Sequence, residues 1–143
     1  ISNCSNNYGP NQNKEKFIPT VIDSLLNGAL IPVYGKGDNI RDWIYVKDHC
    51  KALWKILTNG KRGETYLVGA DCEKTNLEII YEICKILGKE PDDFISFVQD
   101  RKGHDFRYAI DHDKISKNLK WKPSVNLGKG LRETIKHYEE KPS

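Results

Sequence analysis

Apolar residues recur at helical spacing in five segments of the chain. In the first segment, Phe17, Val21 and Leu25 lie four residues apart, and Gly28 follows as a residue type that commonly ends helices. In the third segment, Thr75 and Glu78 form the sequence signature of a capping box. The pattern predicts helices at about residues 17–27, 48–59, 75–87, 111–119 and 127–138.

The ends of the second and fourth helices are expected at residues that favour helix termini. Asp48 is expected to cap the second helix, which should end at Gly60, and Asp111 is expected to cap the fourth. Pro123 prevents the fourth helix from continuing. The residues expected to face inward from the second helix are Ala52, Leu53, Ile56 and Leu57.

Short β-rich runs alternate with these helices, which indicates an α/β class, or an α+β lobe. Residues 5–13 are rich in Asn, Gly and Pro and predict a loop. Because the strands are few and brief, residues 1–143 are expected to form one lobe that packs on a larger sheet, and not a complete doubly wound sheet. The predicted strands cover residues 30–34, 43–46, 65–68, 95–98 and 108–110.

Composition and charge exclude several classes of protein. The chain is 38% hydrophobic and 30% charged, and its net charge of +3 is carried by dispersed basic residues, so nucleic-acid binding is not expected. No apolar run approaches the roughly 20 residues that span a bilayer, so no membrane partner is expected. The sequence contains no methionine, and we therefore expect a fragment of a longer protein.

Candidate residues for metal binding and nucleophilic catalysis are too scattered for either function. None of the four histidines stands in an HxxxH or HExxH arrangement, so no metal site is expected. No Gly-x-Ser-x-Gly motif supports a serine nucleophile. The widely spaced cysteines favour reduced thiols in a cytoplasmic protein. They are Cys4, Cys50, Cys72 and Cys84.

Tyr81 and Lys85 match the pattern Tyr-x-x-x-Lys, which occurs often by chance on helices. No Gly-rich cofactor loop precedes them. We therefore expect the Tyr81 ring to pack in the core and Lys85 to reach solvent, without a catalytic role.

A run at residues 34–46 contains residue types that bind anionic ligands. Its glycines let the backbone approach a ligand, and the planar guanidinium of Arg41 suits phosphate. The alternative is a turn followed by an exposed Arg41 that is paired with Asp42. The residues alone leave both interpretations open.

Two further runs have similar potential. In residues 100–108 a tight turn brings together Arg101, His104 and Arg107, either to bind a diphosphate or as a solvated charged loop. Residues 5–10 offer amide side chains for hydrogen bonding, although Asn-rich turns are also common without a ligand.

Five motifs occur in order along the chain. They are Cys-Ser-Asn-Asn-Tyr-Gly-Pro at 4–10, Tyr-Gly-Lys-Gly-Asp at 34–38, Ile-Arg-Asp-Trp-Ile-Tyr-Val-Lys-Asp-His at 40–49, Arg-Lys-Gly-His-Asp-Phe-Arg-Tyr-Ala-Ile-Asp at 101–111 and Trp-Lys-Pro at 121–123. Together they resemble the dTDP-glucose 4,6-dehydratases, a family of extended short-chain dehydrogenases/reductases. Enzymes that act on UDP- or GDP-sugars share parts of the first two motifs, whereas the third and fourth are more particular to the dTDP-glucose enzymes.

The resemblance implies an enzyme of two parts. An N-terminal Rossmann domain, absent from this chain, would hold NAD and carry a Tyr-x-x-x-Lys pair and a Thr-Asp-Glu acid/base set. Residues 1–143 would form the C-terminal nucleotide-sugar-binding domain, with no catalytic residue and no activity alone. The intact enzyme would be a cytoplasmic homodimer, an NAD-dependent lyase that converts dTDP-glucose to dTDP-4-keto-6-deoxyglucose and water. The alternatives are another nucleotide-sugar epimerase or dehydratase, or a non-catalytic nucleotide-sugar-binding module.

The resemblance also assigns site residues. Amide and cationic side chains among them suit the diphosphate, and an aromatic ring and a proline suit the thymine base. Cys4 would lie near the nicotinamide of NAD. Lys102 stands where a proline is common in the family, which makes that loop less rigid. The implied substrate-binding residues are Asn6, Lys16, Phe17, Pro32, Tyr34, Arg41, Asn76, Arg101 and His104.

Overall fold

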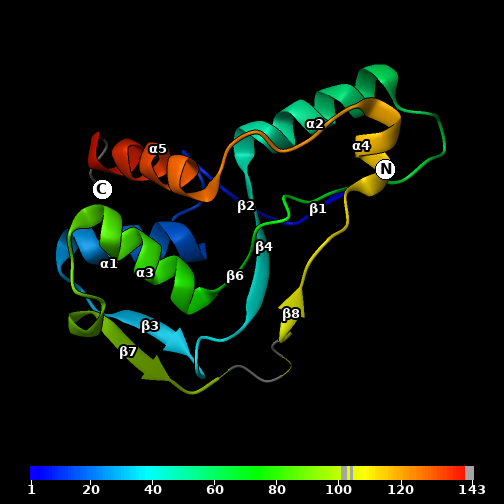
Figure 1. The fold of residues 1–143 in the computed structure, drawn as a ribbon. Coiled ribbons are helices and arrows are strands. Elements are labelled where there is room, and N and C mark those ends of the chain that lie inside the picture. The colour runs from blue at the N-terminus through cyan, green and yellow to red at the C-terminus, as the bar shows by residue number, and fades with distance from the viewer. Residues whose placement is uncertain (101–102, 104, 141–143) are drawn as a thin grey trace.

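The computed structural model describes residues 1–100, 103 and 105–140 as five α-helices, one short 3₁₀-helix and eight strands (Figure 1). The helices are α1 (Phe17–Asn27), α2 (Val46–Asn59), α3 (Asn76–Leu87), α4 (Asp113–Leu119) and α5 (Leu127–Glu140), and the 3₁₀-helix is η1 (Pro91–Asp93). The strands are β1 (Ser2–Cys4), β2 (Asn6–Tyr8), β3 (Ile31–Tyr34), β4 (Ile40–Tyr45), β5 (Tyr66–Val68), β6 (Glu73–Thr75), β7 (Ile95–Val98) and β8 (Arg107–Tyr108).

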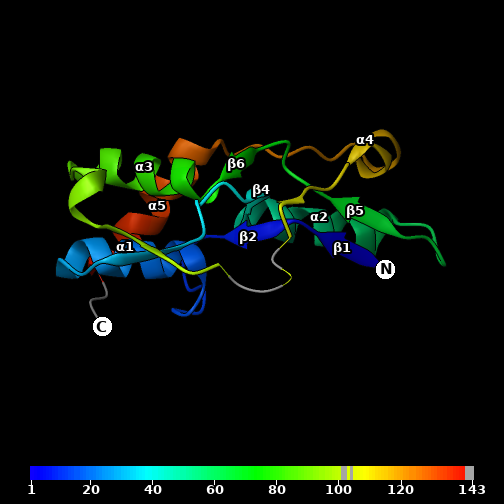
Figure 2. The ribbon, with the colours of Figure 1, turned by 90° about the horizontal axis from the view of Figure 1, so that it is seen from below.

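The strands form three small sheets, which confirms the α/β class. β1 pairs with β5 and β3 pairs with β7, in both cases parallel. The third sheet has β4 at its centre, between parallel β2 and antiparallel β6, with β8 also alongside β4. Figure 2 shows β1 and β2 following one another in line, so the chain leaves one sheet and enters the next within a few residues.

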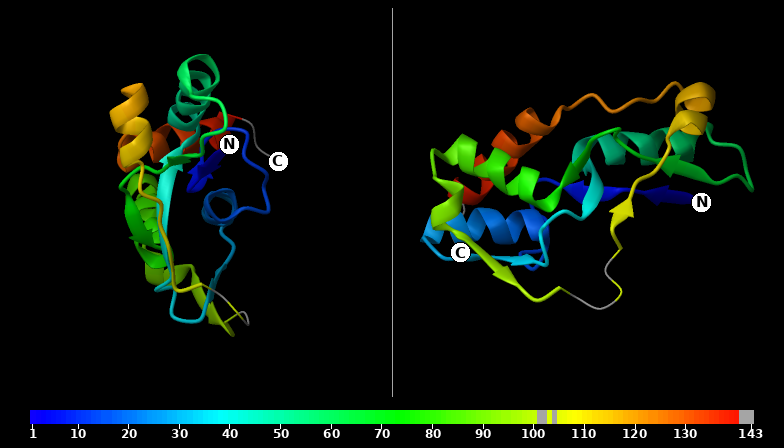
Figure 3. Two further views of the ribbon diagram at one scale, coloured as in Figure 1. Left: turned by 90° about the vertical axis from the view of Figure 1, so that its right-hand side faces the viewer. Right: turned by 60° about the horizontal axis from the view of Figure 1, so that its bottom comes forward.

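Two hydrophobic cores lie on either side of β4. Alternate side chains of a strand point to opposite faces. Trp43 and Tyr45 therefore join the core beneath α1, α3 and α5, whereas Ile44 joins the core beneath α2 and α4. The left panel of Figure 3 shows α2 and α4 side by side at the top of the molecule, and Figure 1 shows α1, α3 and α5 on the other side of β4.

Helices α1 and α3 confirm the predictions made from their sequence signals. Gly28 and Gly88 follow the two helices with φ of 70° and 64°, in the left-handed conformation that glycine adopts without strain. At the start of α3, the Thr75 hydroxyl accepts a hydrogen bond from the Glu78 amide at 3.1 Å, and the Glu78 carboxylate accepts one from the Thr75 amide at 2.7 Å. The capping box is therefore complete.

The predicted cap of α2 was wrong. Tyr45 occupies the N-cap position, and Asp48 lies in the first turn of the helix. The Asp48 carboxylate instead accepts hydrogen bonds from the Ser124 amide and hydroxyl, both at 2.7 Å, and from the Val125 amide at 2.8 Å. This carboxylate joins α2 to the segment that leads into α5, a connection that local sequence cannot reveal.

The predicted inward face of α2 was only partly correct. Ala52 is fully buried, but Leu53 and Leu57 are 40% and 78% exposed. Trp54 is also exposed, at 66%. Residues four apart lie on one helix face, and here the buried face contains Asp48 and Ala52, so the leucines point away from the sheet. We refer to Leu53, Trp54 and Leu57 as the apolar stripe of α2.

Three other local predictions need correction. Strand β2 lies inside the segment expected to be loop, because its two asparagines and the buried Tyr8 pair in parallel with β4. The strand expected at 108–110 covers Arg107–Tyr108. His112 occupies the N-cap position of α4, while the Asp111 carboxylate accepts a hydrogen bond from the Asp113 amide at 2.7 Å.

The prediction that the Tyr81 ring packs in the core was wrong. Its side chain is 45% exposed, whereas its neighbours Ile80 and Cys84 are fully buried. The helical stripe that α3 buries is centred on these neighbours, and Tyr81 lies outside it. Lys85 is exposed, as expected.

Gly130 on α5 is required by close packing against two buried tyrosines. A Cβ atom there would overlap the hydroxyl of Tyr8 and approach the ring of Tyr45 to 3.0 Å. These side chains are only 1% and 2% exposed, so neither can move aside. We expect Gly130→Ala to lower the free energy of unfolding of the protein by about 1–3 kcal/mol, the usual cost of overpacking.

Gly128, on the same helix, provides a matched control for this prediction. A Cβ atom there would meet no atom closer than 3.6 Å. Gly128→Ala should be neutral, or stabilising by up to about 1 kcal/mol, because alanine favours helix. Urea unfolding of both variants tests the pair, and equal stabilities would contradict the described packing of α5.

None of the helices in the described part of the chain is long and apolar enough to cross a membrane.

Candidate functional site

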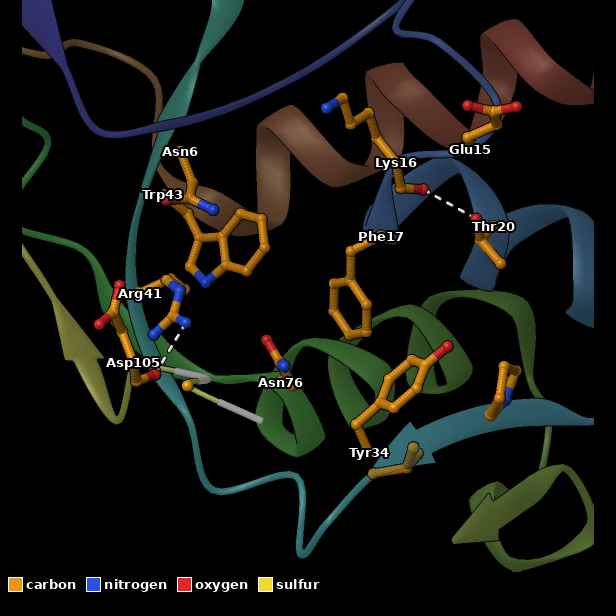
Figure 4. Close-up of a pocket in the computed structure, with 13 residues that line it drawn as sticks. Asn6, Glu15, Lys16, Phe17, Thr20, Tyr34, Arg41, Trp43, Asn76 and Asp105 are labelled. Carbon is orange, nitrogen blue, oxygen red and sulfur yellow. Dashed lines mark hydrogen bonds between the residues drawn. The ribbon is translucent and has the colours of Figure 1, made fainter. Parts of the chain in front are cut away.

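A cavity of about 670 Å³ opens where α1, β2, β3, β4 and α3 meet (Figure 4). The residues come from these five elements, from the segment just before α1 and from the loop after β7. Most are polar or aromatic. The residues that line the cavity are Asn6, Glu15, Lys16, Phe17, Thr20, Pro32, Val33, Tyr34, Arg41, Trp43, Asn76, Gly103 and Asp105.

This cavity brings together seven of the nine residues that the sequence resemblance assigned to substrate binding. They are Asn6, Lys16, Phe17, Pro32, Tyr34, Arg41 and Asn76. The other two, Arg101 and His104, lie outside the described residues. Cys4 is not among the lining residues. Segments separated by up to 70 positions in the sequence, from Asn6 to Asn76, thus face one space.

Arg41 provides the cationic group at one end of the cavity. Its guanidinium donates hydrogen bonds to the carbonyl oxygens of Ile40, at 2.7 Å, and Asp105, at 2.8 Å. These acceptors are neutral, and no carboxylate forms an ion pair with Arg41 within the described residues. The positive charge is therefore available to an anion, which a guanidinium can bind through two parallel hydrogen bonds.

The alternative that Arg41 pairs with Asp42 is wrong. The Asp42 carboxylate is buried and accepts hydrogen bonds from the amides of Ala70 and Cys72, both at 2.8 Å. Because neighbouring residues on a strand point to opposite faces, Asp42 points away from the cavity that Arg41 lines. Asp42 holds β4 to the loop after β5.

Two helices direct their N-termini at the cavity. Lys16 occupies the N-cap position of α1, and Asn76 is the first residue of α3. The Thr20 hydroxyl donates to the carbonyl oxygens of Lys14 and Lys16, at 3.0 and 2.9 Å, which fixes the start of α1. A helix N-terminus carries partial positive charge, which favours a bound anion. At α3, however, the amides of Asn76, Leu77 and Glu78 already donate to the Asn39 carbonyl, the Gly37 carbonyl and the Thr75 hydroxyl, so this terminus contributes through its charge and through the Asn76 side chain.

Aromatic rings form the other part of the cavity. The Phe17 and Trp43 rings lie 5.9 Å apart between centroids with 31° between their planes. Figure 4 shows Trp43 between Asn6 and Phe17, with Tyr34 facing Phe17 from β3. Such a surface suits a planar ring, and Pro32 adds a further apolar wall.

Trp43 is the main site residue that the sequence resemblance missed. It is 5% exposed, and its indole nitrogen donates to the Lys74 carbonyl at 3.3 Å. The signal was present in the sequence, because Arg41 and Trp43 lie two apart on one strand and must share a face. The other missed lining residues are Glu15, Thr20, Val33, Gly103 and Asp105.

Arg107 does not line the cavity. Its guanidinium forms two hydrogen bonds with the Glu73 carboxylate, both at 2.6 Å. The hydrogen bond from Arg107 lowers the pKa of the exposed Glu73 carboxyl. Arg107 therefore ties β8 to β6, and we do not assign it to the diphosphate.

The fold and the cavity define an α/β protein with a cavity lined by cationic, amide and aromatic side chains. Comparison with known proteins identifies its family. Residues 1–134 match the family described as GDP-mannose 4,6 dehydratase, and the chain belongs to this family.

Particular relatives are dTDP-glucose 4,6-dehydratases, as the sequence motifs indicated. The chain is 50% identical to the enzyme of Escherichia coli over 144 residues, which cover 96% of this chain and 40% of the relative. It is 51% identical to the enzyme of Mycolicibacterium smegmatis, covering 100% of this chain and 43% of the relative. The chain therefore spans about two fifths of the length of the curated relatives it matches.

Solved structures show the same relationship. The dTDP-glucose 4,6-dehydratase of Streptomyces venezuelae, solved with NAD bound, superposes with a TM-score of 0.95 at 40% identity, covering 99% of this chain and 44% of that one. The enzyme of Bacillus anthracis in complex with NAD gives a TM-score of 0.93 at 43% identity, with the same coverage. A UDP-glucose 4-epimerase from Thermotoga maritima, at 24% identity and a TM-score of 0.92, shares the fold.

Proposed function

We propose that this chain is the nucleotide-sugar-binding part of a dTDP-glucose 4,6-dehydratase, an NAD-dependent lyase that converts dTDP-glucose to dTDP-4-keto-6-deoxyglucose and water. The observation that carries the proposal is that one cavity gathers a guanidinium, two amide side chains, two helix N-termini and a set of aromatic rings. The relatives at about 50% identity support the choice of dTDP-glucose among nucleotide sugars.

The thymine base and the diphosphate of a dTDP-sugar each have a matching surface in the proposed site. The thymine base would lie against Tyr34, Pro32 and Phe17, where planar and apolar surfaces meet. The diphosphate would lie at Arg41 and Asn6. There the guanidinium would exchange its two backbone carbonyl acceptors for charged phosphate oxygens, which form stronger hydrogen bonds.

We assign NAD to a domain that would precede this chain in the intact enzyme. When bound, NAD would accept a hydride from C4 of the sugar and return it to C6. This chain has no Gly-rich strand-to-helix loop that could hold the dinucleotide, so NAD would be held mainly by the preceding domain, with Cys4 near its nicotinamide. The proposed catalytic pair and the acid/base set would lie in the same preceding domain.

The exposed surfaces around β1 support such a domain. Among the described strands, β1 pairs only with β5, so its other edge is unpaired. Parallel sheets are normally larger and covered on both faces, yet Asn3 and Leu67 remain exposed on this one. The apolar stripe of α2 is also exposed. A Rossmann domain would supply a parallel strand to β1 and apolar helices to these surfaces.

For the whole enzyme we propose a cytoplasmic homodimer.

Nucleotide selectivity tests the proposal against the related enzymes. We expect dTDP to bind the intact protein at least about tenfold more tightly than UDP or GDP, as measured by isothermal titration calorimetry. Tighter binding of UDP or GDP would instead assign the protein to another nucleotide-sugar epimerase or dehydratase.

A further inference from the structure

The β1–β2 junction is held by the side chain of Asn7. The chain passes from the β1–β5 sheet to the β2–β4 sheet at Ser5, whose amide still bonds to the Val68 carbonyl at 3.0 Å. The Asn7 amide nitrogen donates to the Cys4 sulfur at 3.3 Å and to the Ser5 carbonyl at 3.2 Å. The Asn7 side chain, which belongs to β2, is thus bonded both to the last residue of β1 and to the residue between the two strands.

His49 holds Asn7 in turn. Its Nδ1 atom lies 2.9 Å from the Asn7 Oδ1 atom. Since the Asn7 nitrogen already donates to two acceptors, its oxygen faces the imidazole, and Nδ1 must carry the proton. His49 stands in the first turn of α2 and is half-buried, and burial lowers the pKa of its imidazole, which favours the neutral ring. Helix α2 is thereby connected to the junction through a single side chain.

The residue that this network fixes is Asn6. Its neighbours on either side are Ser5, whose carbonyl accepts from Asn7, and Asn7 itself, whose carbonyl accepts from Gln12 at 2.8 Å. Asn6 lines the cavity, while the neighbouring Asn7 points to the opposite face of the strand. The backbone that carries Asn6 is therefore anchored from behind the site.

We infer that His49 is a positioning residue for nucleotide-sugar binding, which acts through Asn7 to hold the Asn6 amide in the cavity. The inference rests on the proposed function and names a residue outside the cavity wall. His49 would not touch the ligand. Its contribution would be the single hydrogen bond from Nδ1 to Asn7.

Three variants of the intact enzyme separate this role from a purely structural one. His49→Phe keeps the ring but removes the donor. His49→Asn places an amide nitrogen where Nδ1 stands and restores the donor. Asn7→Ala removes the link on which His49 acts. Binding of dTDP is measured by calorimetry and folding by the thermal midpoint.

We expect His49→Phe to weaken dTDP binding about fivefold to tenfold, which corresponds to the loss of one hydrogen bond. His49→Asn should bind within about twofold of the wild type, and both variants should keep thermal midpoints close to the wild-type value. Adding His49→Phe to Asn7→Ala should cause no further loss, because residues that act through one another are not additive.

Several results would overturn the inference. The first is wild-type dTDP affinity in His49→Phe. The second is a His49→Asn variant that folds but does not recover the affinity. The third is an equal loss of affinity when His49→Phe is introduced into the wild type and into Asn7→Ala. A parallel fall in the thermal midpoint of both His49 variants would show a merely structural role. Absence of dTDP binding by the wild type would overturn the proposed function itself, and the inference with it.

Discussion

Replacing Arg41 by alanine in the intact enzyme is expected to weaken dTDP binding about 10- to 150-fold. Hydrogen bonds to charged groups contribute about 1.5–3 kcal/mol, and about 1.4 kcal/mol is a factor of ten. Arg41 lines the cavity and is bonded only to neutral carbonyl groups among the described residues, so its charge can address the diphosphate. Calorimetric titration with dTDP measures the effect.

Two further variants make the Arg41 experiment specific. Arg41→Lys keeps the charge but loses the planar fork, and should bind with intermediate affinity. Arg107→Ala removes an arginine that pairs with Glu73 outside the cavity lining, and should bind within about threefold of the wild type. Equal affinities for wild type and Arg41→Ala would place the diphosphate elsewhere. Arg101, which the sequence also assigns to substrate binding, lies outside the described residues, and its role stays a prediction.

Asp48→Ala is expected to lower the stability of the fold by about 3–4 kcal/mol. The Asp48 carboxylate is 1% exposed and accepts hydrogen bonds from two backbone amides and one hydroxyl at Ser124 and Val125. Ser124 is exposed and Val125 half-buried, so water can reach some of these donors after the substitution. The expected cost therefore corresponds to about two hydrogen bonds to a charged group, at about 1.5–3 kcal/mol each. The thermal midpoint of the intact protein should fall by about 5–10 °C. The exposed Asp92→Ala should change it little.

The contribution of Asp48 should also depend on pH. Burial alone would raise the pKa of this carboxyl, but the hydrogen bonds from Ser124 and Val125 and the charge of Lys51 lower it below its ordinary value of 3.8. A depressed pKa stabilises the fold fully above the ordinary value, and this contribution is lost as the pH falls through the lower, folded-state pKa. The difference between wild type and Asp48→Asn should therefore shrink only below about pH 4. A difference that disappears at higher pH would contradict this assignment.

Local signals in the sequence predicted the helices well and the tertiary connections poorly. Gly28, Gly88 and the Thr75 capping box act through neighbouring backbone groups, so their effects can be read from a few residues. Asp48 resembles a helix cap in sequence, but its partner is 76 residues away at Ser124. Strand β2 was missed because its polar residues become a strand only by pairing with β4.

The candidate site was likewise predicted well where single residues carry the signal and poorly where contacts between distant segments decide. Motif resemblance found the residues that differ chemically from their surroundings, such as Arg41 and Asn6, and the cavity brings them together. It missed Trp43, which strand alternation would have placed beside Arg41. It also missed the role of His49, because the bond to Asn7 joins helix α2 to a strand 42 residues earlier.

The most direct test of the central claim is the conversion of dTDP-glucose, followed by NMR, with the full-length protein and with this chain alone. We predict that the full-length protein forms dTDP-4-keto-6-deoxyglucose, because it would supply the NAD-binding domain. This chain alone, even with added NAD, should form none above a protein-free blank. Product from the chain alone would contradict the assignment of chemistry to the preceding domain. No product from a full-length protein that is folded and binds NAD would contradict the proposed function.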